Sequence, residues 1–236
     1  MDFSLDYFKK QVERLEDNFL GKFHKRIEPI QKFMSYYKCA LMEIETKFKV
    51  LDEEFSFLHE RNPIDNIKTR IKDFESIRKK LRRKKISPSI NSIEQNIHDI
   101  AGIRIICPFI DDIYMLADCL AAQDDIKVLE RKDYIANPKE NGYRSLHLIV
   151  EIPIFLHNEK RLVKVEVQLR TIAMEFWANL EHRLHYKKEM DEKISKELSV
   201  ELTDCAEVIA NLDIKMKNIH DRIENKSTQN VQMKKN

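Results

Sequence analysis

Apolar and polar side chains alternate along residues 163–170, and this period of two predicts a half-buried β-strand. The apolar face holds four aliphatic residues: Val163, Val165, Val167 and Leu169. The polar face holds three charges and one amide: Lys164, Glu166, Gln168 and Arg170. Thr171 follows and can cap a helix that begins at Ile172. Because helix N-terminal amides attract anions, we expect Glu166 beside a phosphate-sized positive site, although a plain solvent-facing strand also fits the alternation.

A helical pattern, with apolar residues every three or four positions, precedes and follows Pro29. The first stripe is Phe8, Val12, Leu15, Phe19 and Phe23. The second stripe is Ile30, Met34, Tyr37, Leu41, Ile44, Phe48, Leu51 and Phe55. Because proline lacks the amide that a helix interior uses, we expect two helices that meet near Glu28. We interpret both stripes as packing surface and not as part of a site.

Basic residues cluster between positions 70 and 85, far above the average density of the chain. They are Arg70, Lys72, Arg78, Lys79, Lys80, Arg82, Arg83, Lys84 and Lys85. A solvated face, a nucleic-acid surface and a polyphosphate pocket all fit such a cluster. Phe74 is the one aromatic residue in this stretch, so the stacking platform of single-strand nucleic-acid binders is missing.

The next segment predicts a strand around Arg104 that ends at Pro108, a helix over residues 111–123, and a strand over residues 126–130. Asp99, Gly102 and Arg104 lie together at the start of the first of these strands. A glycine between an acid and a base permits a ligand to approach the backbone closely. We therefore regard this strand start as a candidate site.

The pair His98–Asp99 also occurs in metal-dependent phosphohydrolases. Such an enzyme needs further histidines upstream at metal-ligand spacing, and His24 and His59 do not supply that set. We therefore set the phosphohydrolase interpretation aside.

Asn141–Gly142 predicts a tight turn, and polar side chains of four kinds follow it. They are Tyr143, Arg144, Ser145 and His147. An ordinary cross-strand aromatic is the alternative interpretation of Tyr143. The chain has only 3 glycines, however, and two of them, Gly102 and Gly142, fall at these polar clusters, where backbone freedom is useful.

The composition fits one catalytic domain with extensions. The chain has 236 residues, 42% of them hydrophobic, which is enough for one sizeable core. Lys plus Arg (42) and Asp plus Glu (40) nearly cancel to +2, so anion binding must come from local clusters. The cysteines are widely spaced and favour neither a zinc site nor disulfides: Cys39, Cys107, Cys119 and Cys205. Because the N-terminus lacks a secretion signal and no apolar run could span a bilayer, we expect a cytoplasmic protein without a membrane partner.

Near the C-terminus, apolar residues step by alternating four and three positions, as in a coiled-coil seam. They are Leu198, Leu202, Cys205, Ile209, Leu212, Met216, Ile219 and Ile223. This seam predicts an amphipathic helix over residues 191–225 that needs a partner, either the N-terminal helix or another subunit. Residues 226–236 are polar, and we expect them to form a disordered tail.

Several of these stretches together resemble the synthetase domain of the RelA/SpoT family, and more narrowly the small alarmone synthetases. The similar stretches are DIAGIRI at residues 99–105, YIANPKENGYRSLH at 134–147 and VEVQLRTIAMEFW at 165–177. The resemblance covers residues 66–188. It implies a mixed α/β sheet of about five strands with flanking helices, related to nucleotidyltransferases. It also implies Mg²⁺-dependent transfer of pyrophosphate from ATP to the 3′-hydroxyl of GDP or GTP, giving ppGpp or pppGpp.

The resemblance assigns ATP-binding roles to a first set of residues. Arg70 and Arg104 would sandwich adenine with their flat guanidinium groups. Lys72 and Lys80 would hold the ATP phosphates, with Arg78 or Lys79 as possible assistants. Asp99 would hold Mg²⁺, which prefers carboxylate and phosphate oxygens.

Glu166 would complete the Mg²⁺ site or take the proton of the 3′-hydroxyl, so the two catalytic acids are Asp99 and Glu166. A second set would bind GDP or GTP: Lys139, Tyr143, His147, Gln168 and Glu175. Tyr143 would stack on guanine, and Lys139 and His147 would face the phosphates. Gln168 would help to position the acceptor. Glu175 departs from the asparagine of some members, but its carboxylate can still accept hydrogen bonds from guanine.

The resulting domain plan has a helical extension over residues 1–62, a synthetase domain over 63–190, the amphipathic helix over 191–225 and the tail. Related small synthetases are tetramers, so the resemblance implies a homotetramer, with RNA or (p)ppGpp as a candidate regulator. Two other functions compete with this plan. One is an RNA-binding module built on the basic residues 70–85, and the other is a purely helical oligomerisation protein, which leaves Asp99, Tyr143 and Glu166 unexplained.

Overall fold

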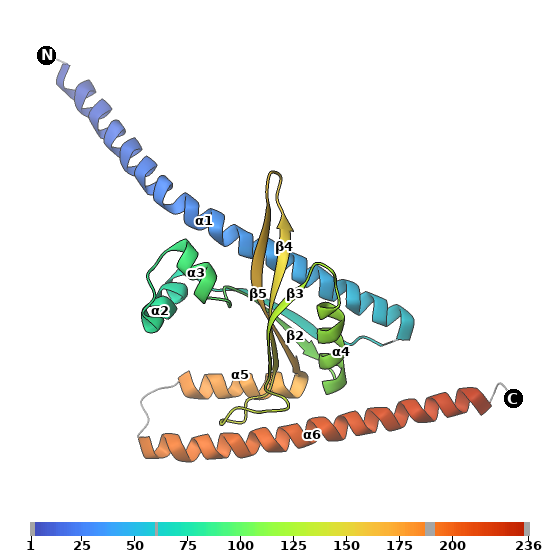
Figure 1. The fold of residues 1–236 in the computed structure, drawn as a ribbon. Coiled ribbons are helices and arrows are strands. Elements are labelled where there is room, and N and C mark those ends of the chain that lie inside the picture. Colours follow the sequence, from blue (N-terminus) through green and yellow to red (C-terminus); the bar gives the residue numbers. More distant parts are fainter. Residues whose placement is uncertain (1–2, 60, 187–191, 234–236) are drawn as a thin grey trace.

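A mixed sheet of five strands forms the centre of the computed structural model, and the helices surround it (Figure 1). The strands are β1 (Asn66–Ile71), β2 (Ala101–Cys107), β3 (Lys127–Asp133), β4 (Leu146–Phe155) and β5 (Lys160–Thr171). Their order in the sheet is β1-β2-β5-β4-β3. The neighbours β2 and β5 are parallel, and the other neighbouring pairs are antiparallel. The predicted fold class is confirmed.

The helices surround this sheet and include two long ones near the termini. They are α1 (Phe3–His59), α2 (Phe74–Lys84), α3 (Ile90–Asn96), α4 (Ile110–Ala121), α5 (Ile172–Tyr186) and α6 (Glu192–Met233). The structure describes the backbone of residues 3–59, 61–186 and 192–233, and the side chains of residues 29–58, 61–184 and 198–223. Within these ranges, no helix has the length and apolar character that a membrane span requires.

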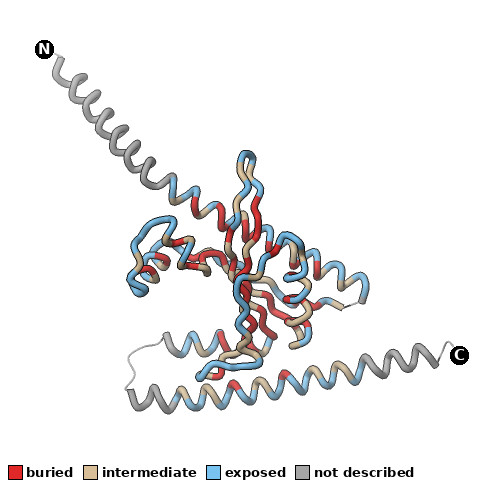
Figure 2. The backbone as a smooth tube through the Cα atoms, viewed as in Figure 1, coloured by how far each residue is buried: buried red, intermediate tan, exposed pale blue. Residues whose placement is uncertain are grey.

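One face of the sheet is packed against α1 and α4. The alternation along β5 is confirmed, because Val163, Val165, Val167 and Leu169 are all buried. The second N-terminal stripe supplies the opposing surface, in which Ile44 and Phe48 of α1 are fully buried and share one core with the sheet. Figure 2 shows buried stretches, in red, along the strands and in the middle of α1. The predicted extension over residues 1–62 therefore contributes to the same core as the predicted synthetase domain.

The prediction that two helices meet near Glu28 is wrong. A single helix, α1, continues through Pro29. An interior proline removes one hydrogen bond and crowds the carbonyl four residues earlier, but a long helix can accommodate this at a cost of about 3 kcal/mol. Packing begins one turn later at Phe33, which holds the second half of the helix on the sheet. The side chains of the first stripe lie outside the described residues.

The helix α6 runs beside α5 along one end of the sheet (Figure 1). Trp177 of α5 donates a hydrogen bond from Nε1 to the carbonyl of Leu202 at 3.0 Å, and Ala206 is buried against the same tryptophan. The predicted helix is present, but it extends to Met233, so the disordered tail was wrongly predicted for residues 226–233. This segment contains neither glycine nor proline, and polar residues alone do not end a helix. Residues 234–236 lie outside the described residues.

Candidate active site

The open face of the sheet carries two adjacent rows of polar side chains, because neighbouring strands place paired residues on the same face. In the first row, Gly102 of β2 pairs with Glu166 of β5, which pairs with Ile149 of β4. In the second row, Arg104 pairs with Gln168, which pairs with His147. The polar face predicted for β5 thus adjoins the predicted strand start at Gly102, although these positions lie far apart in sequence.

Two clefts open on this face, and Asp99 and Glu166 line both of them. The first, which we call the β1-side cleft, has a volume of about 330 Å³ and is lined by Lys68, Arg70, Gly102, Arg104 and Gln168. The second, the β3-side cleft, has a volume of about 350 Å³ and is lined by Lys80, Lys84, Lys132, Tyr134, Lys139 and His147. The two predicted acids therefore lie at the junction of two clefts that are rich in cations.

Asp99 is held by two lysines from different elements. Its Oδ2 accepts hydrogen bonds from Lys72, which follows β1, and from Lys80 of α2, the latter at 2.7 Å. Burial opposes the charge of Asp99, but these hydrogen bonds outweigh it and hold the pKa of the carboxyl below its usual value. Its other oxygen, Oδ1, is buried and has no hydrogen-bond partner within the described residues. The site therefore contains an ionised carboxylate with one oxygen free to take a ligand.

Glu166 lies in the opposite electrostatic setting. Burial and the charge of Asp99 both raise the pKa of the Glu166 carboxyl, although Gln168 donates a hydrogen bond to its Oε2 at 3.1 Å. The described residues contain no cluster of three or more metal-ligating side chains, and Asp99 and Glu166 are the two carboxylates that line both clefts. Two carboxylates suit Mg²⁺, which commonly completes its octahedral shell with phosphate oxygens and water.

The aromatic loop residue Tyr143 is fixed by a short chain of hydrogen bonds. Arg170 donates to the Tyr143 hydroxyl at 2.5 Å and lies over its ring, and that hydroxyl is 2.8 Å from Nε2 of His147. Burial, followed by the charges of Arg170 and nearby lysines, lowers the pKa of His147 to about 3. The imidazole is therefore neutral at neutral pH, and its contact of 3.7 Å with Glu166 is not an ion pair.

Glu175 connects the two ends of the open face. Its Oε1 accepts hydrogen bonds from Lys68 of β1 at 2.9 Å and from Arg104 of β2 at 3.1 Å, and its Oε2 accepts one from Arg170 at 2.9 Å. Burial alone would raise its pKa, but Lys68 and the two arginines lower the pKa of Glu175 to about 2. In the nucleotide-free protein, Arg104, which was predicted to stack on adenine, thus contacts Glu175, which was predicted to bind guanine.

The loop between β3 and β4 brings Lys139 over two aromatic rings. Its Nζ lies 4.6 Å from the ring centre of Tyr134 and 4.8 Å from that of Tyr143. The turn predicted at Asn141–Gly142 is confirmed, since Gly142 donates to the Lys139 carbonyl at 2.8 Å with a positive φ of 82°. This turn positions a cation and an aromatic ring at the rim of the β3-side cleft.

One sequence-based expectation about Glu166 is wrong. Thr171 does cap α5, because its Oγ1 accepts from the Met174 amide at 3.1 Å, but Thr171 itself is fully buried and donates to Asp213 at 2.6 Å. It also lies roughly 16 Å along the strand from Glu166. Lysine side chains, rather than helix amides, make the surroundings of Glu166 positive.

Every predicted site residue lies on or beside the open face, but Lys72, Tyr143 and Glu175 only contact the residues that line the clefts and do not line them. The suggested assistants Arg78 and Lys79 are exposed on α2 and do not line either cleft. Sequence reasoning placed Lys84 only in the basic cluster, and it gave no role to five further residues in or beside the clefts: Lys68, Glu130, Lys132, Tyr134 and Arg170. The sequence did indicate Arg170, because it lies on the same polar face of the strand as Glu166 and Gln168.

Comparisons with known proteins find both similar sequences and similar folds. Residues 69–191 match the region found in RelA/SpoT proteins. The GTP pyrophosphokinase YwaC of Bacillus subtilis is 47% identical over 188 residues, which cover 80% of this chain and 89% of that protein. The small alarmone synthetase 2 of B. subtilis superposes with a TM-score of 0.72 at 44% identity, covering 81% of this chain and 98% of that one. The small alarmone synthetase 1 of the same species, bound to its product pppGpp, gives a TM-score of 0.74 at 35% identity, covering 84% and 99%. The chain belongs to the RelA/SpoT family.

Proposed function

We propose that this protein is a GTP pyrophosphokinase that transfers the β,γ-pyrophosphoryl group of ATP to the 3′-hydroxyl of GDP or GTP. The products are AMP and ppGpp or pppGpp. The observation that carries this proposal is the position of Asp99 and Glu166 at the junction of two cation-lined clefts. A transfer between two nucleotides needs two binding sites that meet at the reacting atoms, and a one-nucleotide hydrolase does not.

In this proposal ATP occupies the β1-side cleft. Arg70 and Arg104 project from paired strands on the same face of the sheet, so their guanidinium groups can stack on the two faces of adenine. Lys72 and Lys80 already converge on Asp99, and they offer charge-assisted hydrogen bonds to the ATP phosphates. Positioning and charge neutralisation are the main requirements of phosphoryl-type transfer.

The guanine nucleotide occupies the β3-side cleft. Tyr143, which contacts His147 of this cleft, offers a ring held by Arg170. Glu175, which is bonded to Arg170, and Gln168, which lines the adjoining β1-side cleft, offer acceptors and an amide for the guanine edge. Lys139 and the neutral His147 face the acceptor's ribose and phosphates. To bind guanine, Glu175 must give up at least one of its hydrogen bonds to Lys68, Arg104 and Arg170. Stacking of Arg104 on adenine would break one of these bonds.

At the junction, the 3′-oxygen attacks the β-phosphorus of ATP, and the bond from that phosphorus to the bridging oxygen of the α-phosphate breaks. Glu166, with its raised pKa, takes the proton of the 3′-hydroxyl. Asp99 and Glu166 are the residues that would hold Mg²⁺, which supplies charge neutralisation to the ATP phosphates. The buried free oxygen of Asp99 supports this assignment.

Incubation of the protein with Mg²⁺, GDP or GTP, and ATP labelled at either the α- or the γ-phosphate tests the proposal. The γ-label should appear in a guanosine product and the α-label in AMP. Asp99→Asn serves as the matched inactive control. Release of the γ-label as free phosphate or pyrophosphate without a guanosine product would contradict the proposal.

The same proposal includes a cytoplasmic homotetramer. Support comes from the outer side of α6, where apolar side chains of the predicted seam are exposed in the single chain: Leu212, Met216, Ile219 and Ile223. A continuous apolar stripe of this length is unfavourable in water and is typical of a subunit interface. Regulation by (p)ppGpp or RNA stays a prediction. The exposed basic residues of α2 are a feature that favours RNA.

A further inference from the structure

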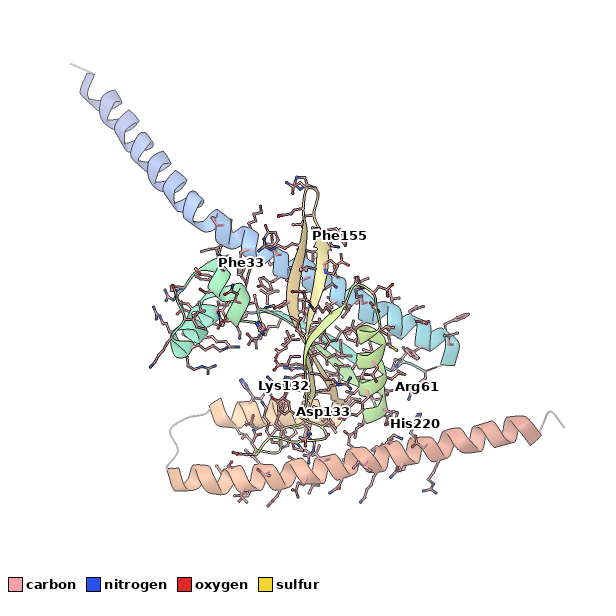
Figure 3. The ribbon with its side chains drawn as sticks, in the orientation of Figure 1. Phe33, Arg61, Lys132, Asp133, Phe155 and His220 are labelled. Carbon is pink, nitrogen blue, oxygen red and sulfur yellow. The ribbon has the colours of Figure 1, made fainter. Side chains whose placement is uncertain are left out.

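A β-bulge in β3 changes which side chains face the β3-side cleft. Val128 pairs with Val150, which is buried on the packed face of the sheet, but the register then shifts and Glu130 pairs with Ile149 on the open face. One extra residue in a strand moves every following side chain to the other face. The bulge therefore turns Glu130 and Lys132 towards the site, and Figure 3 labels Lys132 beside β3.

The pairing pattern fixes how far Glu130 lies from the catalytic acid. Glu130 pairs with Ile149 of β4, and Ile149 pairs with Glu166 of β5. Two strand spacings separate the Glu130 and Glu166 backbones, about 10 Å. A ribose whose 3′-hydroxyl lies at Glu166 can thus extend its 5′-phosphates across β4 to the end of the cleft formed by β3.

The charges at this end of the cleft are mostly positive. Lys84, Lys132 and Lys139 all line it, whereas Glu130 is the one carboxylate there besides Asp99 and Glu166 among the described lining residues. Glu130 and Lys132 form an ion pair of 2.7 Å, with side chains that are 46% and 50% exposed. Because such exposed pairs contribute little stability, an incoming phosphate can displace Glu130 from Lys132. The Glu130 charge then remains beside that phosphate.

We propose that Glu130 sets the acceptor's preferred phosphate length, favouring guanosine 5′-diphosphate over the 5′-triphosphate. The inference rests on the proposed function, since it concerns the acceptor of that reaction. Lys132 attracts the terminal phosphate of either nucleotide, but the third phosphate of GTP adds negative charge next to the Glu130 carboxylate. The positive charge of Lys132 therefore favours binding of both nucleotides, whereas the negative charge of Glu130 opposes binding of the extra phosphate of GTP.

The test measures kcat/KM for GDP and for GTP with saturating ATP and Mg²⁺. Glu130→Gln should raise the GTP/GDP ratio of kcat/KM about threefold to tenfold, mainly through a lower KM for GTP, and Glu130→Lys should raise it further. Asp118→Asn is the matched control, because Asp118 forms an exposed ion pair of 2.8 Å with Arg131, the neighbour of Glu130 on β3. This control should leave the ratio unchanged.

An unchanged GTP/GDP ratio in active Glu130→Gln and Glu130→Lys variants would overturn the inference. An equal gain with both acceptors would also overturn it, because that result indicates general attraction and no discrimination by length. Failure of the proposed function looks different. In that case the wild-type protein forms no labelled guanosine product with either acceptor.

Discussion

At the residue scale, the two acids that we propose as catalytic differ because their surroundings differ. Burial and the Asp99 charge raise the pKa of Glu166, which suits a proton acceptor. Burial also opposes ionisation of Asp99, but Lys72 and Lys80 lower its pKa, which suits a permanent charge beside a cation. Opposite pKa shifts of neighbouring carboxylates are a common basis for separate roles in catalysis.

The raised pKa of Glu166 predicts that Glu166→Gln stabilises the nucleotide-free protein at neutral pH. A carboxyl whose folded-state pKa is raised contributes stability below its unfolded pKa and loses it as the pH rises through the folded pKa. Glutamine does not titrate, so the variant's advantage in melting temperature should be absent near pH 4 and grow towards pH 7. Melting curves across this range measure it. A variant that is less stable than wild type at pH 7 would contradict the raised pKa of the Glu166 carboxyl.

Arg70 provides the cleanest test of adenine stacking. Arg70→Lys keeps the positive charge but loses the planar group, so the KM for ATP should rise about tenfold while the KM for GDP stays near wild type. Arg104→Lys is less selective, because Arg104 also donates to Glu175 and Gln168 of the acceptor side. Arg131→Lys is the control. Arg131 forms an exposed ion pair with Asp118 and lines neither cleft, so this change should leave both KM values unchanged. Equal losses for ATP and GDP in Arg70→Lys would argue against stacking.

At the scale of elements, α6 supports the loop that carries Tyr143 and Lys139. A Cβ atom on Gly142 would lie 2.5 Å from the Cβ of Ala206, and Arg144 beside it donates to the Ala206 carbonyl at 3.3 Å. Further along α6, His220, which Figure 3 labels, stacks on Phe109, the residue that precedes α4. The C-terminal helix is therefore a structural neighbour of the acceptor site as well as a candidate interface.

This contact predicts that Gly142→Ala displaces the acceptor loop. The KM for GDP should rise about tenfold or more while the KM for ATP changes little, because the positive φ and the clash with Ala206 both act on the loop. Ala206→Gly in the same chain removes the clash but not the backbone strain, so it should restore part of the affinity. Steady-state kinetics of the three variants measure this. An unchanged KM for GDP in Gly142→Ala would contradict the supporting role of α6.

At the scale of the whole molecule, the outer stripe of α6 predicts assembly into an oligomer. Leu212→Glu places a charge in the exposed stripe and should lower the mass that light scattering measures. Lys215→Glu, at an exposed position of the same helix outside the predicted seam, is the matched control and should keep the wild-type mass. A folded Leu212→Glu variant with the wild-type mass would exclude this interface.

Local patterns predicted most of the molecule because local forces decide them. The period of two along residues 163–170 identified both the buried face of β5 and its polar face, and the Thr171 cap set the start of α5. Pro29 was misjudged because a proline weakens a helix locally, whereas packing from Phe33 onward maintains it. The end of α6 was misjudged because a polar composition does not by itself end a helix.

The candidate site was predicted less completely, because long-range pairing decides its details. The register between β2 and β5 places Gly102 opposite Glu166, and the bulge in β3 turns Glu130 and Lys132 towards the cleft. Neither the register nor the bulge has a signature in the sequence. The supposed anion site at the start of α5 failed for a related reason, since α6 covers that helix start through Asp213.

The measurement that tests the central claim most directly is the turnover of Asp99→Asn, Glu166→Gln and the double variant with saturating ATP, GDP and Mg²⁺. The two acids act at one junction, so each single change should lower kcat by at least about a hundredfold. The double variant should be little worse than the worse single variant, because a site that lacks one acid gains little from the other. A kcat near wild type in either single variant, with the fold intact, would contradict the claim that both acids catalyse the transfer.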